Sequence, residues 1–441
     1  MPQNFLPCDR DQSLLLAPDL RDWLPEDHLA WFLIDAVAEL DLSAFFGDYR
    51  ADGHGRAAHD PEMMVALLIY SYATGERSSR KIEKRCCEDI AHRVICANQA
   101  PDHATIARFR SRHQEALAGL FTEVLKLCSK AGLISIGTIA FDGTRMTADA
   151  ASRQNKTYRQ LGKEILEEAE AADAAEDEKF GEARGDELPP ELATRKGRLE
   201  RLHEAKRQLE EERQAKLDEM EAWKQAKAEF IERTGKGQGW PTKPRPIADE
   251  PDRRINTTDP DSRPVKTATG FLQGYTAQAA AAEGQVIVSA ELITGGNERH
   301  RLGPMAQAAE TELAEAGITE RPETVLADAG YWNSPQIEAV EAKGIRVLVP
   351  PDADTRKAPT KIRSGPRYER MRDLLKEPDN EAAYHRRQQM IEPVFAQIKV
   401  GLRAGRFQRR GLAACRSEWR LIAATHNLLK LHRSGLGLAG S

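Results

Sequence analysis

Residues 137–144 read GTIAFDGT, an apolar, strand-like run followed by Asp142. A second such run, residues 324–327 (TVLA), is followed by Asp328, and a helix-like stretch at 389–395 (QMIEPVF) carries Glu392. Two carboxylates at strand ends and one on a later helix can converge on a pair of divalent cations, because hard cations prefer oxygen ligands. A two-metal site can activate a nucleophile and stabilise the leaving oxygen of a phosphodiester. The three acids therefore predict polynucleotidyl transfer.

Each of these acids also has an ordinary explanation when it is taken alone. An Asp after an apolar run is commonly a turn residue, which applies to Asp142 and Asp328. Glu392 beside Pro393 could lie in the first turn of a helix, where the helix dipole favours a carboxylate. The metal-site interpretation rests on the three residues together.

The composition indicates a globular chain of two or three domains. Of its 441 residues, 40% are hydrophobic and 30% charged, and no run approaches the roughly 18 apolar residues that a membrane helix needs. Residues 1–10 contain no apolar segment, so no secretory signal is expected. Six cysteines, two of them adjacent at 86 and 87, provide neither a disulfide framework nor a paired metal-ligand spacing. We therefore expect a cytoplasmic protein.

The net charge of −5 averages segments of opposite sign. Residues 164–191 contain twelve acidic and two basic residues, whereas residues 384–433 contain eleven Lys or Arg and two acids. Phosphate binding depends on local positive charge, so the C-terminal stretch is a candidate nucleic-acid surface. The alternative is that this stretch is a solvated helix face.

Residues 19–133 are predicted to form several short helices. Pro61 opens a strongly apolar helix, because proline costs least at the first helical position. Ser78 or Ser79 is expected to cap the next helix, and another helix begins near Asp102. A compact all-helical module of this kind is typical of helix-turn-helix-like DNA binders. Two basic groups are candidates for phosphate contacts, or else solubilise helices: Arg77, Arg80, Lys81, Lys84 and Arg85, and Arg108, Arg110 and Arg112.

Residues 163–231 are rich in Ala, Glu, Lys and Arg, and their apolar residues follow a heptad pattern after Pro189-Pro190. This pattern predicts a helical hairpin or coiled coil, followed by a Gly/Pro-rich linker. Beyond it we expect a hairpin at 274–292, a helix at 301–316, strands at 324–327 and 346–349, and helices at the C-terminal end. This order predicts an α/β fold with one mixed sheet flanked by helices, into which the helical segment is inserted.

Seven stretches, in this order, resemble a known family: GERSSRKIE (75–83), PDHATIARFR (101–110), FDGT (141–144), TDPDSR (258–263), GYTAQ (274–278), ADAGY (327–331) and EPVFAQIK (392–399). The chain resembles a DDE transposase of a bacterial insertion sequence, in the branch with a helical N-terminal domain and a ribonuclease-H-like catalytic core. The resemblance extends from about residue 5 to residue 435.

The resemblance implies specific roles for individual residues. Asp142, Asp328 and Glu392 match the family's three catalytic metal ligands, which hold two Mg²⁺ ions, with Mn²⁺ as a substitute. Lys399 matches a basic residue directed toward DNA, and Arg403 is a further expected DNA contact. The family often carries a Tyr and an Arg before the Glu. Tyr384 and Arg387 are the nearest candidates here, with Arg387 expected to contact DNA, although Gln388 occupies the spacing expected for the Arg.

The implied function is binding of double-stranded DNA at transposon ends, hydrolysis at the 3′ ends and joining to target DNA. The implied domains are residues 1–133 (DNA-binding), 134–160 and 241–435 (catalytic core), and 161–240 (coiled-coil insertion and linker). We expect a nucleoid-associated homodimer or larger synaptic assembly, with no membrane partner. The alternatives are an inactive DNA-binding remnant or regulator, a plain metal-dependent nuclease, and a structural coiled-coil protein.

Overall fold

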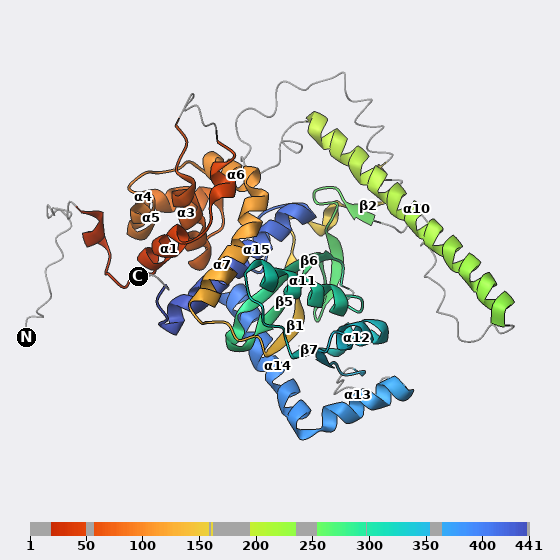
Figure 1. Cartoon of the computed structure of the whole chain (residues 1–441). Coiled ribbons are helices and arrows are strands. Elements are labelled where there is room, and N and C mark those ends of the chain that lie inside the picture. The colour runs from red at the N-terminus through yellow and green to blue at the C-terminus, as the bar shows by residue number, and fades with distance from the viewer. Residues whose placement is uncertain are drawn as a thin grey trace, which may run out of the picture.

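The computed structural model describes residues 19–49, 57–157, 160–161, 195–234, 254–296, 298–352 and 364–438. The predicted acidic stretch at 164–191 and the predicted linker after residue 234 lie outside these residues. The described chain folds into a group of helices, a mixed sheet with helices on both faces, and one long helix beside the sheet (Figure 1).

The N-terminal region is helical, as predicted. Asp60 caps α3 through the amides of Glu62 and Met63, with Pro61 in the first turn. Asp102 caps α6 by accepting a hydrogen bond from the Thr105 amide. The elements are a 3₁₀ helix (Leu20–Trp23), α1 (Leu29–Ala38), α2 (Ser43–Phe46), α3 (Pro61–Ala73), α4 (Ser79–Glu88), α5 (Ile90–Ile95), α6 (His103–Arg112) and α7 (Gln114–Lys130).

The sheet contains both antiparallel and parallel pairs, which confirms the predicted mixed sheet. β5 pairs antiparallel with β1, β4 and β6, whereas β1 pairs parallel with β7, and β7 with β8. The predicted hairpin is formed by β5 and β6, joined by a 3₁₀ turn at Glu283–Gln285. The strands are β1 (Thr138–Thr147), β4 (Arg263–Thr267), β5 (Gly270–Ala282), β6 (Ile287–Thr294), β7 (Thr324–Ala327) and β8 (Arg346–Leu348).

The prediction that Asp142 ends its strand is wrong, because β1 continues to Thr147. The cause is β5, which pairs with β1 from Ile139 to Thr147. The parallel partner β7 is shorter, so Phe141 and Ala327 form the last matched pair between β1 and β7. Asp142 therefore lies inside a strand, at the point where the parallel part of the sheet ends.

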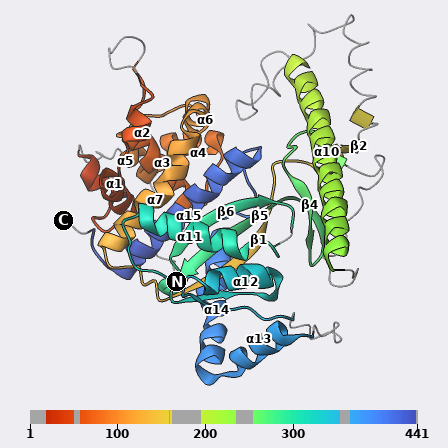
Figure 2. The same cartoon turned by 45° about the vertical axis from the view of Figure 1, so that its right-hand side comes forward.

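Helices cover both faces of the sheet (Figure 2). Phe141 packs on one face in a hydrophobic cluster with residues of α11 (Leu302–Glu315) and α12 (Ser334–Glu341). Ala140, the neighbouring strand residue, faces the opposite cluster, which contains residues of α7, α14 (Pro378–Ala396) and α15 (Leu412–Ser434). This alternation follows from the two-residue period of a strand. A further helix, α13 (Pro366–Lys376), precedes α14, and a π-helix (Gln397–Gly401) follows it.

The N-terminal helices share their core with the C-terminal part of the chain. One buried cluster extends from Ala30 in α1 through Phe121 in α7 to Trp419 in α15. Helix α7 packs closely along α15, which in turn packs on β6 (Figure 1). The N-terminal helices and α15 therefore form one continuous packed body.

The insertion is anchored by a small two-stranded sheet. β2 (Asn155–Thr157) pairs antiparallel with β3 (Arg254–Asn256), which brings together the chain on either side of the insertion. Between them, α10 (Arg195–Thr234) is one helix of 40 residues that stands beside the sheet (Figures 1 and 2). The described residues thus show a single long helix here, and the predicted coiled coil or helical hairpin is not confirmed.

Candidate active site

Asp142 and Asp328 lie next to each other because their strands are paired neighbours. Each is the residue that follows the last matched pair of β1 and β7. The Asp142 carboxylate accepts a hydrogen bond from the Gly143 amide at 2.7 Å, and the Asp328 carboxylate accepts one from the Gly330 amide at 2.8 Å. Burial, followed by the negative charge of Asp328, raises the pKa of Asp142. The structure thus brings two of the three predicted acids together.

A further carboxylate, that of Glu298, lies beside this pair. Its Oε1 atom accepts a hydrogen bond from Arg145 Nη1 at 2.7 Å, and 12% of its side chain is exposed. A Cβ atom at Gly143 would lie 2.5 Å from Glu298 Oε1, and one at Gly330 would lie 3.2 Å from Oε2. The same Gly330 position is 2.9 Å from Asp328 Oδ1. The absence of side chains at the two glycines therefore makes room for Glu298 beside the residues that follow the two Asp residues.

Burial raises the pKa of Glu298 to about 7, with the positive charge of Arg145 opposing the shift and the charges of Asp328 and Asp142 adding to it. The sequence prediction did not include Glu298. The signal that could have indicated it is the glycine that follows each Asp at a distance of one or two residues, because a glycine at such a position permits close approach of another group.

Helix α14 presents Arg387 and Tyr384 to the same centre. Arg387 Nη1 lies 3.4 Å from Asp142 Oδ2, and only 9% of Arg387 is exposed. The Arg387 guanidinium is 5.9 Å from the centre of the Tyr384 ring. Burial raises the pKa of Tyr384, and the negative charges of Asp328 and Asp142 contribute to that shift. Of the arginines before Glu392, Arg387 therefore faces the acids, whereas Arg386 is exposed.

Glu392 lies on the exposed side of α14. Glu392 follows Arg387 by five residues, which is about 1.4 helical turns. The two side chains therefore point to different sides of α14, and Glu392 lies away from the buried face. Among the described residues it makes no hydrogen bond or ion pair, and no group of three or more Asp, Glu, His or Cys side chains is arranged to hold a metal ion. The structure therefore brings Asp142 and Asp328 together and leaves Glu392 apart from them.

The Asp142–Asp328 pair fits a divalent cation by its chemistry. Two carboxylates from adjacent strands are close enough for the charge of one to raise the pKa of the other. A cation between them would offset this repulsion, and oxygen is the ligand atom that Mg²⁺ and Mn²⁺ prefer.

Besides Arg387, two further predicted DNA contacts, Arg77 and Arg110, are buried. Arg77 Nη1 donates to Glu418 Oε1 at 2.8 Å and to a backbone carbonyl of the loop before α15, and 6% of Arg77 is exposed. Arg110, also 6% exposed, donates to the Arg77 carbonyl at 2.8 Å and to the Ser79 hydroxyl. Both guanidinium groups are occupied within the protein, so we do not include them in the DNA-binding proposal.

The other predicted DNA contacts are accessible. Arg80, Lys81 and Arg403 are exposed, and Lys399 is partly buried. Burial and the nearby positive charge of Arg145 lower the pKa of Lys399, so Lys399 lies near Arg145. The aliphatic part of Arg403 packs against Gly75, where a Cβ atom would lie 3.2 Å from Arg403 Cδ. The loop after α14 therefore connects the centre with the turn before α4.

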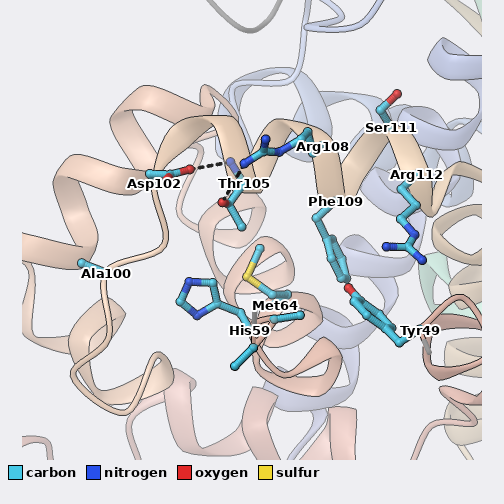
Figure 3. Close-up of a pocket in the computed structure, with 12 residues that line it drawn as sticks. Tyr49, His59, Met64, Ala100, Asp102, Thr105, Arg108, Phe109, Ser111 and Arg112 are labelled. Atoms are coloured by element: carbon cyan, nitrogen blue, oxygen red, sulfur yellow. Dashed lines mark hydrogen bonds between the residues drawn. The ribbon is translucent and has the colours of Figure 1, made fainter. Parts of the chain in front are cut away.

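Arg108 lies on a separate surface, at a cavity of about 680 Å³ in the N-terminal helices (Figure 3). Its guanidinium donates to the Thr105 hydroxyl at 3.4 Å. On the other side of the cavity, the Arg112 guanidinium lies 4.7 Å from the centre of the Tyr49 ring. Arginines and aromatic rings are suitable contacts for nucleic acid, but no acid of the centre lines this cavity, so it is not the reacting site.

Comparisons with known families identify both ends of the chain. Residues 18–112 match the model of a transposase domain (DUF772), and residues 353–432 match that of a transposase DDE domain. The second match contains Glu392 and Lys399, whereas Asp142 and Asp328 lie between the two matches. No curated protein and no solved structure gave a match. Among the described residues, every helix is too short or too polar to cross a lipid bilayer. The two matches confirm the predicted resemblance: each end of the described chain is similar to a transposase domain, as in a DDE transposase of an insertion sequence.

Proposed function

We propose that this transposase is catalytically active and uses divalent cations at Asp142 and Asp328 to cleave and join DNA. The observation that carries the proposal is the position of these two Asp residues, side by side where the parallel part of the sheet ends. The mixed sheet with helices on both faces is compatible with a ribonuclease-H-like core, which the DDE domain implies.

Asp142 and Asp328 would hold the cations, which when bound lower the pKa of an attacking water and stabilise the leaving oxygen of the phosphodiester. Arg387 can bind a non-bridging oxygen of the scissile phosphate, because arginine donates charge-assisted hydrogen bonds to phosphate. Its contact with Asp142 at 3.4 Å also holds the helix α14 against the strand β1. No serine or tyrosine nucleophile is required.

A basic path from the centre to the N-terminal helices would guide the DNA. It begins at Arg145 and Lys399 and continues to Arg403, which packs on Gly75. From there α4 adds Arg80 and Lys81, both exposed. Several lysines and arginines along one path bind the DNA backbone without regard to sequence, with an affinity that falls as salt rises.

Glu392 remains in the proposal as the predicted third ligand. Its exposed position requires this part of α14 to change its conformation before the side chain can reach the cations. Pro393, inside α14, removes one backbone donor, and the π-helix Gln397–Gly401 follows directly. Both features weaken the regular hydrogen bonding of a helix, which lowers the free energy needed for such a change.

The test is cleavage of a labelled duplex that carries the element's own ends, with Mg²⁺ or Mn²⁺. We expect 3′-end nicking and joining by the wild type, and loss of both in Asp142→Asn and Asp328→Asn with DNA binding retained. Arg387→Met should reduce the rate by about 100-fold, as is typical when a donor to the reacting group is removed. The exposed neighbours Arg386→Met and Asp379→Asn are matched controls on the same helix.

Glu392→Gln tests the predicted third ligand separately. Loss of nicking in this variant supports the conformational change in α14, and wild-type activity removes Glu392 from the site. DNA binding by the wild type without any cleavage, with either metal ion, contradicts the proposal and favours a DNA-binding remnant or regulator. Nicking without joining, under conditions that supply target DNA, favours a plain nuclease.

A further inference from the structure

The position of the Glu298 side chain is fixed by its contacts with neighbouring elements. Glu298 lies four residues before α11, and Arg145 from β1 holds its carboxylate. Arg145 is fixed in turn, because it also donates to the Thr276 hydroxyl at 2.8 Å and to the Gly296 carbonyl at 3.3 Å. The carboxylate is therefore directed to one place, beside the glycines that follow the two Asp residues.

Two buried donors without a partner belong to residues next to the two Asp residues: Tyr331 ends the 3₁₀ turn that Asp328 caps, and Arg387 contacts Asp142. The Tyr331 hydroxyl is completely buried and has no hydrogen-bond partner among the described residues. The charges of Glu298, Asp142 and Asp328 all act on it, in addition to its burial, to raise the pKa of Tyr331. Arg387 Nε is the second such donor, on a residue that is 9% exposed. A buried donor without a partner is costly, so its presence indicates a ligand that accepts hydrogen bonds.

The groups around the two Asp residues thus divide into two chemical kinds. The carboxylates of Asp142, Asp328 and Glu298 are ligands for a hard cation. The Tyr331 hydroxyl and Arg387 Nε are donors for an anionic oxygen, such as that of a phosphodiester or a cation-bound water. Their combination fits a cation together with the phosphate that it binds.

We infer that Glu298 is a further carboxylate ligand of the divalent cations held by Asp142 and Asp328. This inference rests on the proposed function, because it concerns the same cations. In the structure Glu298 is paired with Arg145 and Asp142 with Arg387, so the three carboxylates are not arranged around a cation among the described residues. On cation binding, Glu298 exchanges Arg145 for the metal. Arg145 then becomes a free cation next to Lys399, where the DNA backbone is expected.

The competing explanation is that Glu298 only balances the charge of Arg145. The chain contains a matched control for this possibility, since Glu291 is also partly buried and faces an arginine, Arg416, at 3.8 Å. Glu291 lies on β6, and burial raises its pKa too. A general effect of removing a buried carboxylate should therefore be the same at both positions.

The experiment is titration of the full chain with Mn²⁺, with free Mn²⁺ measured by electron paramagnetic resonance. Glu298→Gln should weaken Mn²⁺ binding by at least about 10-fold, comparable to or greater than the loss seen when groups that support metal ligands are removed. Glu298→Asp, which keeps the charge and the fold, should restore part of the affinity. Arg145→Met should leave binding unchanged or make it tighter, and Glu291→Gln should match the wild type.

The variant Asp142→Asn distinguishes a failure of the Glu298 inference from a failure of the proposed metal site at Asp142 and Asp328. If Asp142→Asn weakens Mn²⁺ binding but Glu298→Gln does not, the role of Glu298 is overturned and the proposed site stands. If neither variant changes the binding, the proposed metal site itself is overturned. Equal weakening by Glu298→Gln and Arg145→Met would assign Glu298 to charge balance and contradict the inference.

Discussion

At the scale of single residues, Arg77 shows how burial decides the role of a basic side chain. Its guanidinium is bonded to Glu418, whose side chain is completely buried, and Glu418 also accepts hydrogen bonds from the amides of Gln408 and Arg409. Arg77 belongs to the N-terminal match and Glu418 to the C-terminal match. This ion pair therefore joins the two transposase domains.

Removing one partner of a buried ion pair leaves an uncompensated charge. We predict that Arg77→Met lowers the free energy of unfolding by about 3–5 kcal/mol, measured by chemical denaturation. Lys81→Met, four residues along and exposed, should change it by less than about 0.5 kcal/mol and should weaken DNA binding instead. A stable Arg77→Met variant with reduced DNA affinity would contradict the structural role of Arg77.

The sequence predicted the two Asp residues of the centre because each directly follows an apolar run of residues. Glu298 could not be predicted in this way, since its position depends on how the segment between β6 and α11 packs beside two glycines from distant strands. The location of Glu392 on the exposed side of α14 could have been predicted. Met390, Ile391 and Val394 are apolar and buried, and this spacing leaves Glu392 on the outer face of the helix.

At the scale of elements, α15 contains a buried histidine that makes its packing sensitive to acid. His426 Nε2 donates to the Gln285 carbonyl at 2.9 Å, and its Nδ1 is buried without a partner. Burial, with a smaller effect from the positive charges of Lys430 and Arg433, lowers the pKa of His426 to about 4. The unfolded chain, with a histidine pKa near 6.5, therefore binds a proton that the folded chain excludes.

We predict that this histidine makes the protein less stable as the pH falls from about 6.5 to about 4. Its contribution is complete above pH 6.5 and decreases by about 3 kcal/mol by the time the pH has fallen through the folded pKa. Melting temperatures at pH 7.5 and pH 5 should differ by several degrees more for the wild type than for His426→Gln. The exposed His385→Gln is the control, and the same pH dependence in all three proteins would refute the prediction.

The lengths of elements were harder to predict than their order. The hairpin after residue 274 and the predicted helices occur where the sequence placed them, because their apolar spacing is local, whereas α13 was not predicted. The extension of β1 to Thr147 depends on pairing with the distant strand β5, which the local sequence does not contain. The heptad pattern of α10 likewise did not predict which elements of the protein this helix contacts. Leu209 is buried and Glu212 pairs with Arg263 at 2.5 Å, so this helix uses part of its length to contact the chain around β3 and β4.

At the scale of the whole molecule, α10 extends away from a body in which the N-terminal helices and α15 are packed together (Figure 1). Part of its apolar surface is exposed, with 44% of Leu217 and 41% of Ile231 accessible. A transposase must hold two transposon ends together, and apolar residues on an exposed helix are available for contact with a second copy. This supports the prediction that the chain forms a dimer or a larger assembly through the insertion.

Light scattering of the full chain, free and on end DNA, measures this assembly directly. We expect at least a dimer on DNA, and we expect Leu217→Glu with Ile231→Glu to raise the dissociation constant by at least 10-fold, because each places a charge in the contact. Leu436 follows α15 and is 41% exposed, and Leu436→Glu should leave the assembly unchanged. A monomer in both conditions would exclude synapsis by this chain alone. A dimer insensitive to both α10 substitutions would place the interface elsewhere, and the N-terminal helices at the Arg108 cavity would be the next surface to vary.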